Sequence, residues 1–203
     1  MSAAAVETSP EALVLPGLTA LLQQAADAAG AFVADAKVGV KAKVSTGGKI
    51  DRVLADVEQH AVHGFGWYAS YAELLNQVAG WAARLEAEGA FGETEALLAQ
   101  LLFAEYCTQL VGGIPMNQGE TVRPADLTAS RDVMNRLFDP ALVQLMTQGG
   151  GQAVKTRLAD LVAAARGKAT VEKTGLDETF EMIRDQFHSF AEEKVVPFAH
   201  GWH

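Results

Sequence analysis

The sequence predicts an all-α fold: a helical bundle with a long central helix, followed by the opening helix of a second domain. Two observations favour this fold. Apolar residues recur every three or four positions through most of the chain, as they do along one face of a helix. The hydrophobic residues, 49 % of the chain, are mostly Ala, Leu and Val, and Ala and Leu are strong helix formers.

The first helix is predicted over 17–35, behind Pro16, a residue that a helix tolerates in its first turn. Residues 37–44 alternate between polar and apolar side chains, which is a strand signal. Because no other segment offers a partner strand, we expect a helix end or an extended linker there instead. The Ser-Thr-Gly-Gly run at 45–48 predicts a break.

The central helix is predicted over 49–88, where apolar residues follow helical spacing throughout. At 1.5 Å per residue, this helix would be roughly 60 Å long. Gly64 and Gly66 lie near its middle and favour either a kink or the close approach of another element. Gly89 is the expected C-cap.

The next helix is predicted over 93–111 and is apolar on most sides, which is typical of a helix at the centre of a bundle. Residues 114–127 lack a clean period and are long for a plain connection, so we expect an ordered loop that packs specifically. The remaining elements are a short helix from Ser130 to Asp139, a helix opened by Pro140, a flexible glycine hinge at 149–151 and a helix over 154–165 closed by Gly167.

A polar linker at 167–176 is predicted to separate an N-terminal helical extension domain (1–166) from the truncated start of a second domain (177–203). Asp177 is the expected N-cap of the last helix, and Pro197 is expected to break or kink it. Since the chain stops on an apolar element, we expect the native chain to continue, and the stripe of this helix to lack its partners. The stripe consists of Phe180, Ile183, Phe187 and Phe190.

Composition and charge exclude several classes of protein. The formal net charge of −9 repels phosphate backbones, so no nucleic-acid partner is expected. No stretch approaches the ~18 apolar residues of a membrane span, and residues 1–10 do not resemble a signal peptide. The single cysteine, Cys107, fits a reducing compartment, and the cytoplasm is the expected location.

Two histidines are candidate metal ligands. His60 and His63 share a helix face, but a metal site needs a third ligand and no His-Glu-x-x-His motif is present. A packed or capped histidine pair is the favoured interpretation. The aromatic residues beside them could line a pocket, although bundle core or an interface is the commoner role; these residues are Phe65, Trp67, Tyr68 and Tyr71.

Glu105 and Cys107 are candidate catalytic groups. Glu105 is a lone acid among leucines, and a buried carboxylate can act as an acid or base, but neighbouring polar residues favour a structural role. Cys107 has no cationic neighbour in sequence to lower the pKa of its thiol, so a core position is expected. We therefore assign no catalytic, cofactor-binding or metal-binding residue to this chain.

The stretch 183–202, IRDQFHSFAEEKVVPFAHGW, resembles the opening helix of the acyl-CoA dehydrogenase family. That helix carries a phenylalanine, an acidic pair, a Val-x-Pro-x-Ala and a tryptophan. Members of this family ordinarily begin near this helix, whereas about 175 residues precede it here. Such an extension is similar to one branch, the methylsuccinyl-CoA dehydrogenases. Two stretches look like that branch: 60–75, HAVHGFGWYASYAELL, and 105–127, EYCTQLVGGIPMNQGETVRPADL.

The resemblance implies a parent flavoenzyme of the ethylmalonyl-CoA pathway that oxidises methylsuccinyl-CoA to mesaconyl-CoA with FAD and a catalytic glutamate. The resemblance places those groups beyond His203, so this chain alone is expected to bind no cofactor and to be catalytically silent. Its partners would be the remainder of that enzyme, the acyl-CoA substrate through the parent, and further copies in a homo-oligomer. The alternative hypothesis is a stand-alone helical protein-interaction module.

Overall fold

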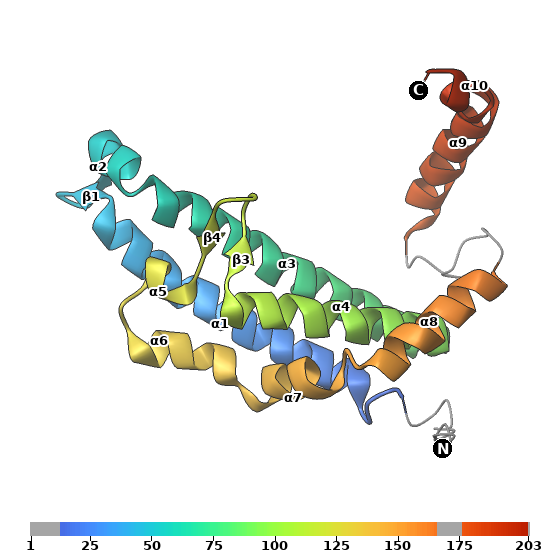
Figure 1. Cartoon of the computed structure of the whole chain (residues 1–203), viewed down its shortest axis with the longest axis horizontal. Helices are drawn as coiled ribbons and strands as arrows, with labels where there is room; N and C mark the ends of the chain where they lie inside the picture. Colours follow the sequence, from blue (N-terminus) through green and yellow to red (C-terminus); the bar gives the residue numbers. More distant parts are fainter. Residues whose placement is uncertain (1–12, 166–175, 203) are drawn as a thin grey trace, which may run out of the picture. The chain divides into compact units, whose positions relative to one another are not determined.

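The computed structural model describes residues 13–165 and 176–202, and it confirms the all-α fold. The chain divides into two compact units, 1–170 and 171–203 (Figure 1). In unit 1 the helices are α1 (Leu18–Lys43), α2 (Arg52–Val57), α3 (Gln59–Ala87), α4 (Glu93–Gly112), α5 (Pro124–Leu127), α6 (Arg131–Asn135), α7 (Pro140–Gln148) and α8 (Gln152–Ala164). Two antiparallel strand pairs accompany them: β1 (Ser45–Thr46) with β2 (Lys49–Ile50), and β3 (Ile114–Pro115) with β4 (Thr121–Val122).

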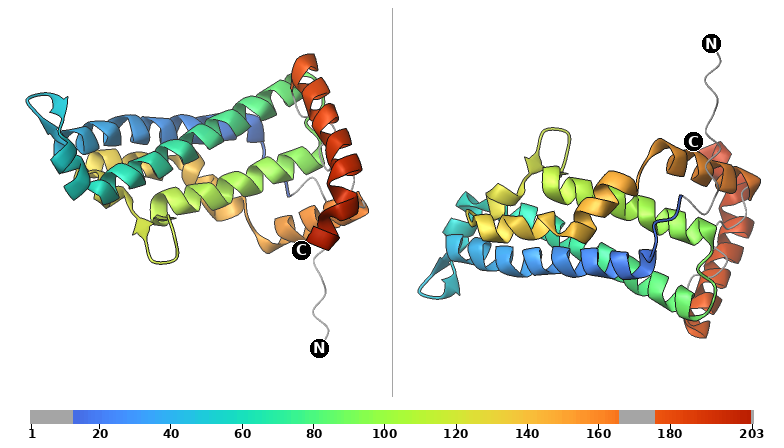
Figure 2. Two further views of the ribbon diagram at one scale, coloured as in Figure 1. Left: turned by 90° about the horizontal axis from the view of Figure 1, so that it is seen from above. Right: turned by 90° about the horizontal axis from the view of Figure 1, so that it is seen from below.

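The core of unit 1 forms where α1 packs along α3, the most extensive helix pair of the bundle (Figure 2). Both helices present small side chains to each other, which lets the two backbones approach closely. Phe32 and Tyr68 fill the space beyond the small residues, with ring centroids 5.4 Å apart. The small buried residues are Ala25, Ala29 and Ala36 on α1 and Ala72, Ala79 and Ala82 on α3.

Helix α4 lies at the centre of unit 1, as predicted, and contacts α1, α3, α7 and α8. Its fully buried Gln100 uses every hydrogen-bonding group of its amide except one acceptor lone pair. The Oε1 atom accepts the backbone N–H of Leu15 at 2.8 Å. The Nε2 group donates to the carbonyls of Leu13 at 3.0 Å and of Gly149 at 3.2 Å. One side chain therefore ties the segment before α1 and the α7–α8 corner to the central helix.

The central helix is shorter than predicted, because the chain leaves helical geometry at Glu58 and separates α2 from α3. Asp51 caps α2 by accepting the N–H groups of Val53 at 2.9 Å and Leu54 at 3.3 Å. Helix α3 runs through both of its central glycines. Gly64 provides a close approach instead of a kink, since a Cβ atom built on it would lie 2.2 Å from Val122 Cγ2 on β4. Gly89 ends this part of the chain with a φ of 66°, which confirms the expected cap.

The strand-like alternation at 37–44 belongs to the end of α1, which continues to Lys43. Val40 and Val44 are buried there. The predicted break at 45–48 is the β1–β2 hairpin, whose turn uses Gly47 and Gly48 at φ 59° and 78°. The helix end expected at 37–44 is therefore confirmed, and the strand pairs of the described residues lie outside this segment, with two residues in each strand.

Residues 114–127 are ordered and pack specifically, as predicted, but they contain the β3–β4 hairpin and α5 instead of a plain loop. Ile114, Val122 and Leu127 are fully buried in the main core. These three side chains fasten the segment to the outside of α1 and α3.

The predicted flexible hinge at 149–151 is instead a tightly packed corner between α7 and α8. A Cβ atom on Gly149 would lie 3.3 Å from Ala104 Cβ of α4, and one on Gly150 would lie 3.1 Å from the same atom. The predicted caps are confirmed: the Ser130 hydroxyl accepts from Val133 N at 3.4 Å, and Pro140 is the first residue of α7.

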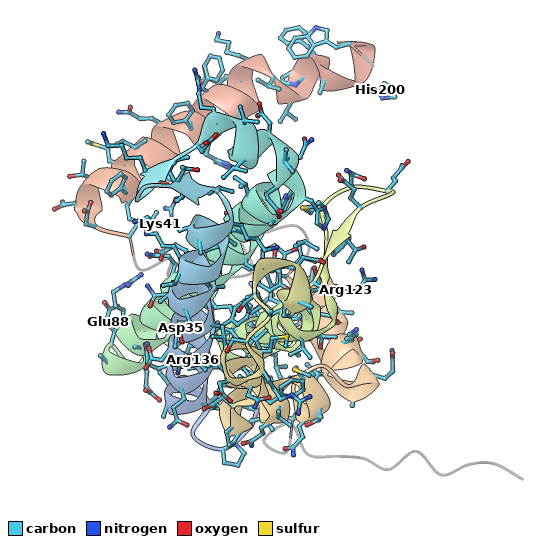
Figure 3. All side chains as sticks on the ribbon, turned by 90° about the vertical axis from the view of Figure 1, so that its left-hand side faces the viewer. Asp35, Lys41, Glu88, Arg123, Arg136 and His200 are labelled. Atoms are coloured by element: carbon cyan, nitrogen blue, oxygen red, sulfur yellow. The ribbon has the colours of Figure 1, made fainter. Side chains whose placement is uncertain are left out.

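Charged pairs join the outer elements of unit 1 to the bundle. Arg157 of α8 donates two hydrogen bonds, of 2.8 and 2.6 Å, to the carboxylate of Glu93 of α4. The bond from Arg157 lowers the pKa of the Glu93 carboxyl. Arg136, in the 3-10 turn η2 (Arg136–Phe138) that follows α6, pairs with Asp35 of α1 at 2.5 Å (Figure 3).

Unit 2 consists of α9 (Glu178–Lys194) and α10 (Val196–Trp202), and Asp177 caps α9 by accepting from Phe180 N at 3.0 Å. The break expected at Pro197 occurs at Val195, and the proline lies in the first turn of α10. All four residues of the predicted stripe are exposed, with Phe187 the most exposed at 71 %. Most of the predicted linker and the helix end at Gly167 lie outside the described residues.

We expect Gln100→Met to destabilise unit 1 strongly although it preserves side-chain length. The substitution leaves the buried carbonyl of Gly149 and the half-buried backbone groups of Leu13 and Leu15 without this partner, at about 1–3 kcal/mol for each group that stays buried and unsatisfied. Urea unfolding followed by circular dichroism measures the loss. The matched control is Gln77→Met on α3, whose amide donates only to the exposed Glu73, and its stability should change little. Equal effects of the two substitutions would show that the Gln100 amide does not hold the segments together.

The two glycines of α3 should respond to alanine in opposite directions. Gly66→Ala meets no atom within 4 Å and removes a helix-destabilising residue, so it should stabilise by up to about 1 kcal/mol. Gly64→Ala forces Val122 to move, and overpacking of this kind costs about 1–3 kcal/mol. Thermal unfolding of the two variants checks the sign of each change; a stabilising Gly64→Ala would contradict the close packing of β4 on α3.

Candidate functional site

The surface most suited to binding in unit 1 is an apolar groove of about 470 Å³ between α3 and α4. Helix α3 contributes one wall and helix α4 the other, and nearly all of the lining atoms are apolar. The groove is lined by Val78, Trp81, Leu98, Ala99, Leu101, Leu102, Glu105 and Tyr106. Most of these side chains are only half-buried, so the groove is open to solvent.

A row of aromatic rings continues the groove along α3. Tyr71 packs on Tyr106 of α4 with ring centroids 4.5 Å apart, and Trp67 meets Tyr71 edge-on at 6.3 Å. The Tyr71 hydroxyl donates to Gln109 Oε1 at 2.9 Å, and burial raises the pKa of this phenol. These rings hold their polar groups in hydrogen bonds while exposing apolar faces, which suits contact with another apolar surface.

Glu105 is the single charged residue that lines the groove. It is half-exposed and pairs with Lys155 of α8 at 2.7 Å, so it is not the buried carboxylate that would serve as an acid or base. The groove can therefore accept apolar side chains, but its lining offers little to bind a charged ligand.

The two histidines are not brought together in one site. His60 lies between two carboxylates, with Nδ1 3.8 Å from Glu120 and Nε2 3.5 Å from Asp126. His63 accepts the indole N–H of Trp67 at 3.1 Å. Among the described residues, no group of three or more His, Cys, Asp or Glu side chains could hold a metal ion. The structure thus gives the histidines separate contacts rather than a shared packed or capping role.

The remaining candidates from the sequence belong to the core. Tyr68 is fully buried and donates its hydroxyl to the Leu110 carbonyl at 3.0 Å, and burial raises the pKa of its phenol well above the usual range. Cys107 is buried without a charged neighbour, and this burial raises the pKa of its thiol to about 12. The core position expected for Cys107 is confirmed. The half-buried residues that line the groove were not singled out from the sequence, although the second apolar face of α3 could have revealed them.

No helix in the described part of the chain is both long enough and apolar enough to cross a membrane.

Comparison with known proteins gives one informative similarity. No protein-family model matches this chain. The chain is 44 % identical over 193 residues to (2S)-methylsuccinyl-CoA dehydrogenase of Cereibacter sphaeroides. The alignment covers 93 % of this chain but only 34 % of that enzyme, and it lies in the enzyme's N-terminal part. The chain therefore spans about a third of the length of the curated relative that it matches.

The Cys107 thiol should be inert in the folded protein. Because burial raises its pKa to about 12, the thiol stays protonated at pH 8 and is also inaccessible to reagents. Ellman's reagent should therefore release no colour at pH 8 until urea unfolds unit 1, and then one equivalent per chain. Rapid reaction of the native protein would contradict the buried position. The sign of the pKa shift also makes this group favour folding below its unfolded pKa of 9.0, with the contribution lost as pH rises toward 12.

Proposed function

We propose that this chain is the N-terminal helical portion of an FAD-dependent acyl-CoA dehydrogenase that oxidises methylsuccinyl-CoA to mesaconyl-CoA. The observation that carries the proposal is the 44 % identity over nearly the whole chain to the N-terminal part of a methylsuccinyl-CoA dehydrogenase. That match extends across both units. A stand-alone interaction module is therefore disfavoured.

The stretches that resemble this branch meet in the fold, which supports a shared structural role. Residues 60–75 lie in α3, and residues 105–127 comprise the end of α4, the β3–β4 hairpin and α5. They touch where Tyr68 donates to the Leu110 carbonyl and where Val122 packs against Gly64. The two stretches therefore contain the residues through which the β3–β4 hairpin and the end of α4 contact α3.

The α3–α4 groove does not fit a flavin. Its diphosphate needs cationic or backbone N–H groups and its ring system needs a slot with polar contacts, whereas the α3–α4 groove is lined by apolar atoms. Lys155 beside the groove is already paired with Glu105. We therefore assign the flavin and the catalytic base to the part of the enzyme outside this chain. The role of 1–166 in this proposal is structural, that of a helical extension domain, and 177–203 is the start of the dehydrogenase domain.

The substrate, the cofactor and the location are parts of the same proposal. Methylsuccinyl-CoA is taken from the name of the matched enzyme, and FAD from the acyl-CoA dehydrogenase family that the last helix resembles. The cytoplasm is proposed because a chain with one cysteine, and hence no internal disulfide, is typical of a reducing compartment.

A chimera tests the proposal directly. Residues 1–203 replace the aligned N-terminal part of the Cereibacter sphaeroides enzyme, and oxidation of methylsuccinyl-CoA is followed with an artificial electron acceptor. We expect the chimera to bind flavin and to retain activity, and the same enzyme with this part deleted to lose activity or solubility. This chain alone should show neither a flavin spectrum nor turnover.

Two outcomes would count against the proposal. A chimera that folds and binds flavin but does not oxidise methylsuccinyl-CoA would separate this chain from that activity. Flavin-dependent turnover by residues 1–203 alone would show that the reacting groups lie within this chain. The matched control is a chimera with Gly66→Ala, which alters an open position on α3 and should leave activity unchanged.

A further inference from the structure

His60 lies where three elements of unit 1 meet. It is the second residue of α3, and its ring stands between the β3–β4 hairpin and α5. Its Nδ1 atom lies 3.8 Å from Glu120 in the turn of the hairpin, and its Nε2 atom lies 3.5 Å from Asp126 of α5. The backbone of His60 therefore belongs to the central helices, whereas both carboxylates that face its ring belong to the segment 114–127.

Both carboxylates are oriented by hydrogen bonds within their own segment. Glu120 accepts from Asn117 Nδ2 at 2.7 Å, and Asp126 accepts the backbone N–H of Arg123 at 2.7 Å. Each carboxylate therefore keeps its place in the segment, and a movement of the segment away from α3 would separate both of them from the ring of His60.

The two contacts of the ring differ between its protonation states. A neutral imidazole carries one N–H group, so its other nitrogen presents a lone pair to the carboxylate opposite. The imidazolium carries an N–H group on both nitrogens and a positive charge, so it attracts both carboxylates. The arrangement around His60 therefore suits the protonated ring.

The other charges around His60 do not reverse this preference. Glu58, just before α3, pairs with Lys43 of α1 at 3.4 Å, so these two charges largely cancel. His63, one turn further along α3, accepts a hydrogen bond at Nε2, which leaves its ring neutral. The start of α3 opposes a cation with about half a positive charge, and Arg123 at the start of α5 adds one more. Two carboxylates in contact with the ring outweigh these terms.

We propose that His60 is a pH-sensitive contact that holds the segment 114–127 against the start of α3, more strongly when its ring is protonated than when it is neutral. Histidine ordinarily changes its charge between about pH 5 and 8. The contribution of the contact is therefore present at the acidic end of this window and is lost as the pH rises through it. The proposal rests on unit 1 alone and holds whether or not the proposed enzymatic function is correct.

The burial of the neighbouring residues sets the size of the effect. The three charged side chains are partly exposed, at 43 % for His60, 50 % for Glu120 and 36 % for Asp126, and exposed ion pairs contribute little and are screened by salt. The segment is also anchored in the core by fully buried apolar side chains, which act at any pH. Protonation should therefore change how often the segment opens, by about twofold to fivefold, and should not detach it.

Native-state hydrogen exchange of the 203-residue chain tests the proposal. Two backbone amides report on the segment: Met116 N–H donates to the Glu120 carbonyl at 2.9 Å in the hairpin, and Thr128 N–H donates to the Pro124 carbonyl at 3.2 Å at the end of α5. Their protection factors, corrected for the intrinsic exchange rate at each pH, should be about twofold to fivefold higher at pH 5.5 than at pH 8. Carboxylates ordinarily stay ionised at both pH values.

Three variants and one reference amide identify the group responsible. His60→Gln stays uncharged at both pH values and should abolish the difference, whereas the matched control His63→Gln should keep it. Glu120→Gln removes one of the two carboxylates and should reduce the difference without abolishing it. The amide of Gly149, which donates to Leu145 in the α7–α8 corner, should show no such difference in any variant. Sodium chloride at about 1 M should weaken the difference in the wild-type chain, because it screens exposed charges.

The proposal would be overturned by equal protection of the two reporter amides at both pH values in the wild-type chain. A difference that survives His60→Gln, even if the protection is lower throughout, would show that the residue acts through packing and not through its proton. A difference that His63→Gln abolishes would assign the titration to the other histidine. A difference that the Gly149 amide shares would assign it to the stability of the whole unit.

Discussion

The close approach of α1 and α3 is the constraint from which the rest of unit 1 follows. Alanines on both helices leave no room for large side chains between the two backbones, so the bulky residues lie at the margins of the seam. Tyr68 packs its ring on Phe32 of α1 and donates its hydroxyl to the Leu110 carbonyl near the end of α4. Other bulky side chains of α3 lie toward α4, where Tyr71 packs on Tyr106 and where Val78 and Trp81 line the groove.

The helices could be predicted from the sequence, because burial against a bundle imposes a period that survives in the spacing of apolar residues. The break at Glu58 could not, since the apolar period continues from α2 into α3 and only the backbone changes direction. The sequence also could not decide whether the glycines provide flexibility or close packing. Gly64 and the glycines at 149–150 serve close packing, and the identity of the approaching atoms depends on β4 and α4, which lie far away in the sequence.

The candidate site was less predictable than the fold. Residue types alone drew attention to His60 and Glu105, but tertiary contacts gave each of them an ordinary charged partner on the surface. The groove has no distinctive residue type, and it arises because half-buried side chains of two helices face the same side. Chemistry-bearing motifs therefore reveal little in this chain, whereas the resemblance of whole stretches to a longer enzyme is informative.

The amide of Gln100 has a consequence for spectroscopy. The backbone N–H of Leu15 donates to a side chain that also holds the carbonyl of Gly149, so a single amide proton senses the segment before α1, the central helix and the α7–α8 corner together. The chemical shift of this Leu15 proton in a nuclear magnetic resonance spectrum would report displacement of the α7–α8 corner, because Gln100 binds both Leu15 and Gly149. Leu15 is thus a built-in probe for following the order in which this bundle loosens.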